Sequence, residues 1–276
     1  MNPPIYDAIY LSPHLDDVVL SCSGRIHSQT QAGQRVLVIT VFAGIPERYG
    51  ITAFTRELEA RWGGDEDAVA VRRREDVAAL RVLNAEGLQF DWPDCVYRCD
   101  PTNGDAYYAT EESIFGEIHA AEANWHRLLM TTLDPYLKEA PSTTLYAPLG
   151  VGHHVDHLLT RRAAMNLDRR GLQVLYYEDY PYAGDQQAIA KAQSPWDVAC
   201  WHPKRVWIDQ HALQAKIEAI ACHQSQISTF WPNLDAMAEA VSEQALRVGQ
   251  GQPCESCWRL DERCLGPTDT EMRKPT

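Results

Sequence analysis

Apolar residues gather in short runs along the first part of the chain, and these runs alternate with amphipathic stretches. Residues 9–12 form one run, and residues 36–42 form a second run of mainly β-branched side chains without a polar face. A run of this kind is typical of a strand that is covered on both sides in a parallel sheet. Residues 18–31 have the mixed pattern of a helix, which Gly33 ends. The chain is therefore predicted to open with a strand–helix–strand unit.

The same alternation continues along the chain. Further helices are predicted over four stretches: 69–83, 111–140, 158–170 and 212–228. Further strands are predicted within 88–100 and over 144–149 and 173–177. Prolines at 135 and 141 are expected to break and then to close the second of these helices.

Strands that alternate with helices predict an α/β fold. We expect a Rossmann-like, mostly parallel sheet with helices on both faces. Residues 231–276 are polar and irregular in pattern. The expected organisation is a single domain over residues 1–276, with a core of about residues 5–230 and an irregular C-terminal extension over 231–276.

Charge and composition narrow the expected partners and location. The 276 residues have a net charge of −13, so the field of the chain repels phosphate backbones and we expect no nucleic-acid partner. No apolar run approaches the roughly 20 residues that span a bilayer, and the first residues lack the pattern of a secretory signal. We expect a cytoplasmic protein without a transmembrane segment, and the sequence predicts no particular oligomeric state.

The cysteines do not form an obvious scaffold. Eight are spread along the chain, at positions 22, 95, 99, 200, 222, 254, 257 and 264. At this low density most are expected to be reduced thiols. Cys254, Cys257 and Cys264 have part of the spacing of a structural zinc site, which would need Cys200 or His202 as a fourth ligand. Because no fourth ligand lies nearby in the sequence, we expect no zinc there.

Two segments rich in histidine and aspartate hold most of the candidate chemistry. Both Ser12–Asp17 (SPHLDD) and Gly152–His157 (GHHVDH) follow predicted strands. The carboxyl ends of strands in an open parallel sheet line one crevice, so the two segments can share a site although they are far apart in sequence. Each segment also leads toward a predicted helix, whose first-turn N–H groups suit carboxylates and oxyanions.

The residue types in these segments suit a catalytic metal ion. A catalytic zinc typically has three protein ligands and keeps a fourth position for water. Asp16 and Asp17 are adjacent, so their side chains diverge, and one can bind a metal while the other acts as a general base. In the second segment one histidine can bind the metal, while another, oriented by a carboxylate, donates a proton. Either segment alone could be a helix cap or a solvated loop, but together they favour a metal-dependent hydrolase.

The paired segments resemble the signature of the LmbE-like, or PIG-L, family of zinc-dependent N-deacetylases. Similar stretches follow at residues 72–83, 176–182 and 223–226, so the resemblance extends over roughly residues 5–260. It implies a hydrolase that removes the acetyl group from an N-acetylglucosamine-type conjugate, either a small molecule or a glycoconjugate. Val18 and Asn84 stand where family members often have Glu and Gly. Neither difference removes an implied ligand. Because of them, however, the resemblance does not imply the substrate of any particular family member.

The resemblance also implies a role for each polar residue of the two segments. It makes three residues the ligands of Zn(II), with Fe(II) or Co(II) as alternatives: His14, Asp17 and His157. Asp16 would be the general base. His154 would stabilise the oxyanion and protonate the leaving amine, and Asp156 would orient His154.

Substrate contacts are predicted on the loops over 44–68 and 92–110, which are rich in aromatic and acidic residues. Trp62 and Tyr107 are the expected rim residues for a sugar conjugate. Arg72, within a stretch that resembles the family, is expected to hold an anionic group of the substrate.

Two other classes of protein fit part of the pattern. A non-haem Fe(II) oxygenase also uses two histidines and a carboxylate, although such enzymes resemble double-stranded β-barrels rather than alternating strands and helices. A non-catalytic metal- or sugar-binding module would need only the ligands. The presence of Asp16 and His154, which metal binding does not require, argues against such a module.

Overall fold

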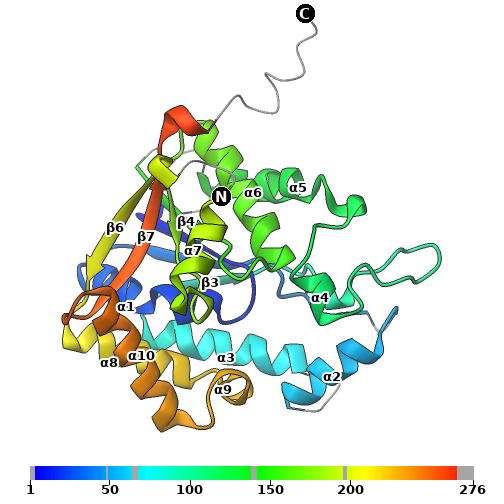
Figure 1. The fold of residues 1–276 in the computed structure, drawn as a ribbon, viewed down its shortest axis with the longest axis horizontal. Coiled ribbons are helices and arrows are strands. Elements are labelled where there is room, and N and C mark those ends of the chain that lie inside the picture. Colours follow the sequence, from blue (N-terminus) through cyan, green and yellow to red (C-terminus); the bar gives the residue numbers. More distant parts are fainter. Residues whose placement is uncertain (1–3, 48, 64–67, 138–141, 195–197, 266–276) are drawn as a thin grey trace, which may run out of the picture.

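A seven-stranded sheet forms the centre of the molecule (Figure 1). The computed structural model describes residues 4–47, 49–63, 68–137, 142–194 and 198–265. Its strands are β1 (Ala8–Ser12), β2 (Val36–Thr40), β3 (Glu86–Gln89), β4 (Thr144–Pro148), β5 (Val174–Tyr177), β6 (Trp201–Trp207) and β7 (Cys254–Leu260). Their order is β3-β2-β1-β4-β5-β7-β6. Strands β1 to β5 are parallel, whereas β7 is antiparallel to both β5 and β6. The predicted mostly parallel α/β sheet is confirmed.

Helices cover both faces of the sheet (Figure 1). One layer contains α1 (Asp17–Gln31), α3 (Ala68–Val82), α8 (Gln210–Ala221) and α10 (Leu234–Val248). The other contains α5 (Trp125–Leu137), α6 (Val155–Arg169) and α7 (Gln186–Gln193). Shorter helices α2 (Ala53–Arg61), α4 (Glu111–Ile114) and α9 (Gln224–Phe230) lie near the carboxyl edge of the sheet.

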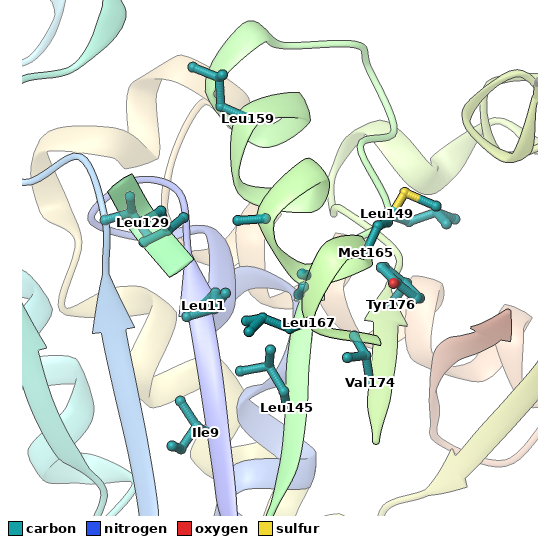
Figure 2. Close-up of a cluster of buried hydrophobic side chains, with 14 of the residues drawn as sticks. Ile9, Leu11, Leu129, Leu145, Leu149, Leu159, Met165, Leu167, Val174 and Tyr176 are labelled. Carbon is teal, nitrogen blue, oxygen red and sulfur yellow. The ribbon is translucent and has the colours of Figure 1, made fainter. Parts of the chain in front are cut away.

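The central strands are buried on both faces, which explains why their sequences lack a polar side. Successive side chains of a strand point to opposite faces, so β1 contributes to two cores. Ile9 and Leu11 pack with α5 and α6, as Figure 2 shows. Ala8 and Tyr10 pack on the opposite face with side chains of α1 and α8. The sheet is therefore a rigid platform for the loops that follow β1 and β4.

Pro135 does not break the helix predicted over 111–140. It lies inside α5, two residues before Leu137, so its missing N–H group removes a hydrogen bond only near the helix end. The break lies earlier, between α4 and α5, over residues 115–124, which include a short 3₁₀ turn. The expected end of this helix at 140–141 lies outside the described residues.

The single helix predicted over 212–228 is two helices. Helix α8 ends at Ala221, and α9 begins at Gln224. The first turn of α9 is held by α3, because the main-chain N–H and the hydroxyl of Ser225 both donate to the carboxylate of Glu75, at 2.9 and 2.6 Å. This contact between distant segments redirects the chain.

The expected irregular extension over 231–276 also needs correction. Its first part forms α10, whose buried Met237, Val241 and Ala245 lie four residues apart on one face. Its second part is β7, which pairs with β5 and with β6 and so completes the sheet. This segment belongs to the core of the domain as far as residue 265, and residues 266–276 lie outside the described part.

The suggested zinc ligands near the C-terminus do not meet. Cys200 does approach Cys264, but the two form a disulfide across a sequence separation of 64. Cys254 and Cys257 lie three residues apart on β7, so their side chains point to opposite faces of the strand. The other six cysteines are free thiols, in agreement with the expectation that most are reduced.

The topology places a crevice at the carboxyl ends of β1 and β4. Strand β2 lies on one side of β1, and β4, which comes later in the chain, lies on its other side. Ligands of open α/β sheets bind where the strand order reverses in this way. Among the described helices, none combines the length and apolar character needed to cross a membrane.

Candidate active site

The two predicted segments meet at this crevice. His14 lies in the turn after β1, and Asp17 is the first residue of α1. His157 lies in the first turn of α6, which begins at Val155, three residues before the predicted start. The early start arises from capping, because the Nδ1 atom of His154 accepts a hydrogen bond from the main-chain N–H of Asp156 at 3.2 Å.

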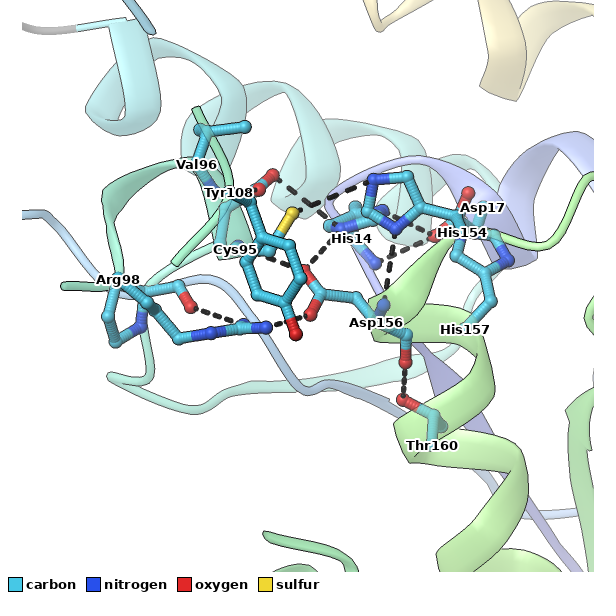
Figure 3. A network of polar contacts seen from close by, with 12 residues as sticks. His14, Asp17, Cys95, Val96, Arg98, Tyr108, His154, Asp156, His157 and Thr160 are labelled. Carbon is cyan, nitrogen blue, oxygen red and sulfur yellow. Dashed lines mark hydrogen bonds and ion pairs between the residues drawn. The ribbon is translucent and has the colours of Figure 1, made fainter. Parts of the chain in front are cut away.

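The three residues implied as zinc ligands converge around one carboxylate oxygen (Figure 3). Oδ2 of Asp17 lies 3.2 Å from Nδ1 of His14 and 3.2 Å from Nε2 of His157. Adjacent ligand atoms around a tetrahedral zinc with bonds of about 2.1 Å are separated by about 3.4 Å. The spacing of these atoms therefore suits a bound metal ion. Nitrogen atoms of His14, His154 and His157 also lie within 4.8 Å of one another.

The outer nitrogens of the two converging histidines are each held by a buried carboxylate. Nε2 of His14 lies 3.1 Å from Oδ2 of Asp156. Nδ1 of His157 lies 2.7 Å from Oδ1 of Asp179. Carboxylates in these positions orient histidines that bind metals through their other nitrogen. This arrangement leaves the inner nitrogens directed toward Asp17.

Asp179 is a site residue that sequence reasoning missed. It follows β5, and its other oxygen accepts the main-chain N–H groups of Gly150 and Val151 at 2.8 and 2.9 Å. It thereby ties the loop after β4 to the ring of His157. The sequence pointed to Asp179 only through the stretch 176–182, which resembles the family. The contact of Asp179 with the loop after β4 depends on the pairing of β4 with β5, which is not evident from the sequence.

The expected contact between the carboxylate of Asp156 and His154 needs correction. The carboxylate instead bridges His14 and Arg98, whose Nη2 atom lies 2.6 Å from Oδ1 of Asp156. Asp156 still orients His154, but through its main-chain N–H. The guanidinium group of Arg98 is the nearer partner for a buried carboxylate. Arg98 was also absent from the predicted site, as was Asp94, whose Oδ2 lies 3.6 Å from Nε2 of His14.

The adjacent carboxylates of Asp16 and Asp17 have opposite electrostatic surroundings. Burial raises the pKa of Asp16 to about 6, although the positive charge of Arg72, whose Nη2 lies 3.5 Å from Oδ1 of Asp16, partly offsets this rise. Burial would also raise the pKa of Asp17, but the charges of His157 and His14 hold it well below its usual range. Asp17 thus stays charged, whereas Asp16 can exchange a proton near neutral pH.

The two histidines of α6 differ in the same way. Burial lowers the pKa of His154 well below its ordinary value, and the nearby charge of His14 adds to this effect. Burial opposes the charge on His157 as well, but Asp17 and Asp179 raise its pKa to about 10. His154 is therefore the neutral imidazole of the pair.

A cavity of about 310 Å³ opens above these groups. Asp16, Asp17 and the three histidines line its base, and its walls include apolar and aromatic side chains: Phe54, Leu58, Trp62, Val96, Ile114, Phe115, Tyr180, Tyr182 and Phe230. Of the predicted substrate contacts, Arg72 and Trp62 line the cavity, and the guanidinium carbon of Arg72 lies 4.7 Å from the centroid of the Trp62 ring. Tyr107 does not line it, because its ring stacks on His119 at 4.4 Å.

The fold and the site together define an α/β enzyme with a cluster of histidines and aspartates, at the carboxyl edge of its sheet, that could hold a metal ion. Residues 9–167 match the sequence profile of the PIG-L family, described as GlcNAc-PI de-N-acetylase, and the chain belongs to this family. A 2′-N-acetylparomamine deacetylase of Niallia circulans is 30% identical over 198 residues, which cover 66% of this chain and 70% of that protein. The protein of the same name from Streptomyces fradiae is 29% identical over 187 residues, which cover 66% and 59%.

Solved structures of deacetylases share the fold. The zinc-inhibited form of teicoplanin deacetylase Orf2 superposes with a TM-score of 0.75 at 25% identity, covering 91% of this chain and 96% of that one. The A40926 pseudoaglycone deacetylase Dbv21 gives a TM-score of 0.69 at 27% identity, covering 92% and 97%. The predicted family, fold and class of enzyme, a deacetylase, are therefore confirmed. The sheet is not the β-barrel that the Fe(II) oxygenase alternative requires.

Proposed function

We propose that this protein is a zinc-dependent hydrolase that removes the acetyl group from an N-acetylated amino sugar carried on a larger conjugate. The observation that carries the proposal is the convergence of Nδ1 of His14, Oδ2 of Asp17 and Nε2 of His157 at the base of a cavity, beside a second carboxylate. These three residues would hold the metal. Two imidazoles and one carboxylate suit Zn(II), and Fe(II) and Co(II) accept the same donors.

A metal ion bound there would polarise the amide carbonyl and lower the pKa of a water molecule. Asp16 is the group placed to take the proton of the attacking water. Its carboxylate lines the cavity next to Asp17, and Arg72 fixes its orientation. As the C–N bond breaks, the same proton passes from Asp16 to the nitrogen of the leaving amine, so the reaction consumes one water and yields acetate and an amine.

His154 acts as a hydrogen-bond donor to the developing oxyanion. Its Nδ1 accepts the N–H of Asp156, so the ring proton of the neutral imidazole resides on Nε2. A donor held in the cavity wall before the reaction stabilises negative charge as it forms on the carbonyl oxygen. This arrangement supports the oxyanion role that we expected. We also expected His154 to protonate the leaving amine, but in this proposal Asp16 supplies that proton.

The apolar walls of the cavity support a substrate larger than a free amino sugar. Phe54, Leu58 and Phe230 lie along the walls, while Arg61 and Glu111 supply polar contacts. The names of the relatives support such a substrate, since one is called a 2′-N-acetylparomamine deacetylase and another is a deacetylase solved in complex with teicoplanin. We infer an N-acetylglucosamine-type sugar placed over the metal site, with its attached group against the apolar wall. No role for nucleic acid is included, and a cytoplasmic location stays an expectation from the sequence.

The proposal is tested by the variant Asp16→Asn. Acetate release from N-acetylglucosamine conjugates is expected to fall by roughly 10²–10⁴-fold, the usual contribution of a general base, while the zinc content stays unchanged. Asp76→Asn is a matched control, since this buried carboxylate on α3 bonds to Thr40 and Gln89 and does not line the cavity. Full activity of a zinc-loaded Asp16→Asn protein would contradict the role of Asp16.

A further inference from the structure

We propose that Arg98 is a positioning residue of the metal site, which acts through Asp156 on the ring of His14. The inference rests on the proposed function, because it assumes that Nδ1 of His14 binds the metal. Arg98 lies in the segment 92–110, which the sequence associated only with substrate specificity. It does not line the cavity, so it does not touch the substrate.

A buried carboxylate joins Arg98 to His14 (Figure 3). Oδ1 of Asp156 lies 2.6 Å from Nη2 of Arg98. Oδ2 of Asp156 lies 3.1 Å from Nε2 of His14 and accepts the main-chain N–H of Cys95 at 3.0 Å. The side chain of Asp156 is fully buried, and that of Arg98 is only 4% exposed. Each oxygen of the carboxylate is therefore fixed by a different partner.

This geometry determines which nitrogen of His14 is available. An ionised carboxylate only accepts hydrogen bonds, so the His14 nitrogen that faces Asp156 carries the ring proton. When a metal ion binds beside Asp17, His14 is neutral and its lone pair lies on Nδ1, the nitrogen directed toward Oδ2 of Asp17. Such outer contacts set both the tautomer and the orientation of a ligating histidine.

Arg98 is itself held rigidly from the other side. Its Nε atom pairs with Oε1 of Glu122 at 2.5 Å, and its guanidinium carbon lies 4.8 Å from the ring centroid of Phe42 and 5.1 Å from that of Trp125. The hydroxyl of Tyr108 donates to Glu122 at 2.7 Å. A planar guanidinium group fixed in this way presents its second edge to Asp156 in one orientation.

The charges of the cluster explain why an arginine is needed. Glu122 and Asp156 are two buried carboxylates that share one guanidinium group. Without Arg98, Glu122 would lose this ion pair, and Asp156 would lose the guanidinium group that holds it in place beside His14. On the other side of the site, Asp179, the carboxylate partner of His157, accepts two main-chain N–H groups. The orientation of His14 thus depends on the side chain of Arg98, which a substitution can replace.

The test compares zinc affinities of the full-length chain, stripped of metal and titrated with Zn(II) against a chromophoric chelator. Arg98→Met is expected to weaken zinc binding by about 10–100-fold, as for other residues that orient metal ligands. Arg98→Lys, which keeps the charge, is expected to recover part of this loss. Arg259→Met is the matched control, since Arg259 also pairs with a buried carboxylate of α6, that of Asp168 at 2.6 Å, which does not line the cavity. It should lower the thermal stability of the metal-free protein yet keep the zinc affinity within about threefold.

Two results would overturn the inference. One is an Arg98→Met protein whose zinc affinity stays within about threefold of the wild type. The other is an equal loss of affinity in Arg259→Met, which would show that the loss of any buried ion pair on α6 weakens zinc binding. If Arg98→Met does not fold, the affinity of Arg98→Lys decides in the same way. A wild-type chain that binds no metal would instead contradict the proposed function, and the inference with it.

Discussion

Asp16 and Asp17 illustrate how neighbouring residues acquire different chemistry. Asp17 is surrounded by His14 and His157, and their positive charges keep its carboxylate ionised. Asp16 is buried with Arg72 as its nearest cation, at the longer distance of 3.5 Å, and its pKa rises to about 6. One carboxylate is thereby suited to hold a metal and the other to move a proton, although the two have the same side chain.

At the scale of single residues, Trp62 and Tyr107 form a matched pair of test positions. Trp62→Ala is expected to raise KM for a large amino-sugar conjugate by about tenfold, because a stacked aromatic ring contributes roughly 1–1.5 kcal/mol. The value of kcat should change little, since Trp62 lines the wall rather than the base of the cavity. Tyr107→Ala should leave both constants unchanged in steady-state assays. Equal effects of the two substitutions would show that Trp62 does not contact the substrate.

At the scale of elements, the buried side chain of Glu255 connects strand β7 to two helices, α1 and α8. Oε1 of Glu255 lies 2.7 Å from Nζ of Lys216 on α8, and it accepts the main-chain N–H of Gly24 on α1 at 3.0 Å. Its other oxygen accepts the N–H of Arg25 at 2.9 Å. Since α1 begins with Asp17, this contact also holds the helix that carries part of the site.

Glu255→Ala is therefore expected to lower the free energy of unfolding by about 3–5 kcal/mol, the usual cost of leaving a buried charge such as Lys216 without its partner. Urea denaturation followed by circular dichroism measures the change. Glu262→Ala removes a glutamate whose side chain is 82% exposed and should change stability by no more than about 0.5 kcal/mol. Similar small losses in both variants would mean that Glu255 does not fasten the helices.

At the scale of the whole molecule, the disulfide between Cys200 and Cys264 closes a long loop at the edge of the sheet. The sequence separation is 64 residues, and the entropy of such a loop in the unfolded chain corresponds to a stabilisation of about 4 kcal/mol as an upper value. The double variant Cys200→Ser, Cys264→Ser is expected to lose about 2–4 kcal/mol of unfolding free energy. A reductant should destabilise the wild type but not the variant. A wild-type chain unaffected by reductant would contradict this prediction.

Short stretches of sequence were sufficient to predict the central strands and the two segments of the site. The unbroken apolar runs at 9–12 and 36–42 predicted buried parallel strands, because a strand covered on both faces needs no polar side. The two segments SPHLDD and GHHVDH predicted a site, because the carboxyl ends of parallel strands meet at one edge. Residue types, spacing and strand ends are all properties that a short stretch of sequence carries.

The residues that complete the site from distant parts of the chain depend on strand order and packing. Asp179 reaches His157 because β5 pairs with β4, and Arg98 reaches Asp156 because the loop after β3 folds back over α6. The same holds for β7, whose sequence looked irregular and whose place between β5 and β6 depends on pairing with both. Tyr107, which was expected on the rim, lies outside the lining of the cavity, and its ring stacks on that of His119. Contacts of this kind depend on strand order and packing, which local periodicity does not encode.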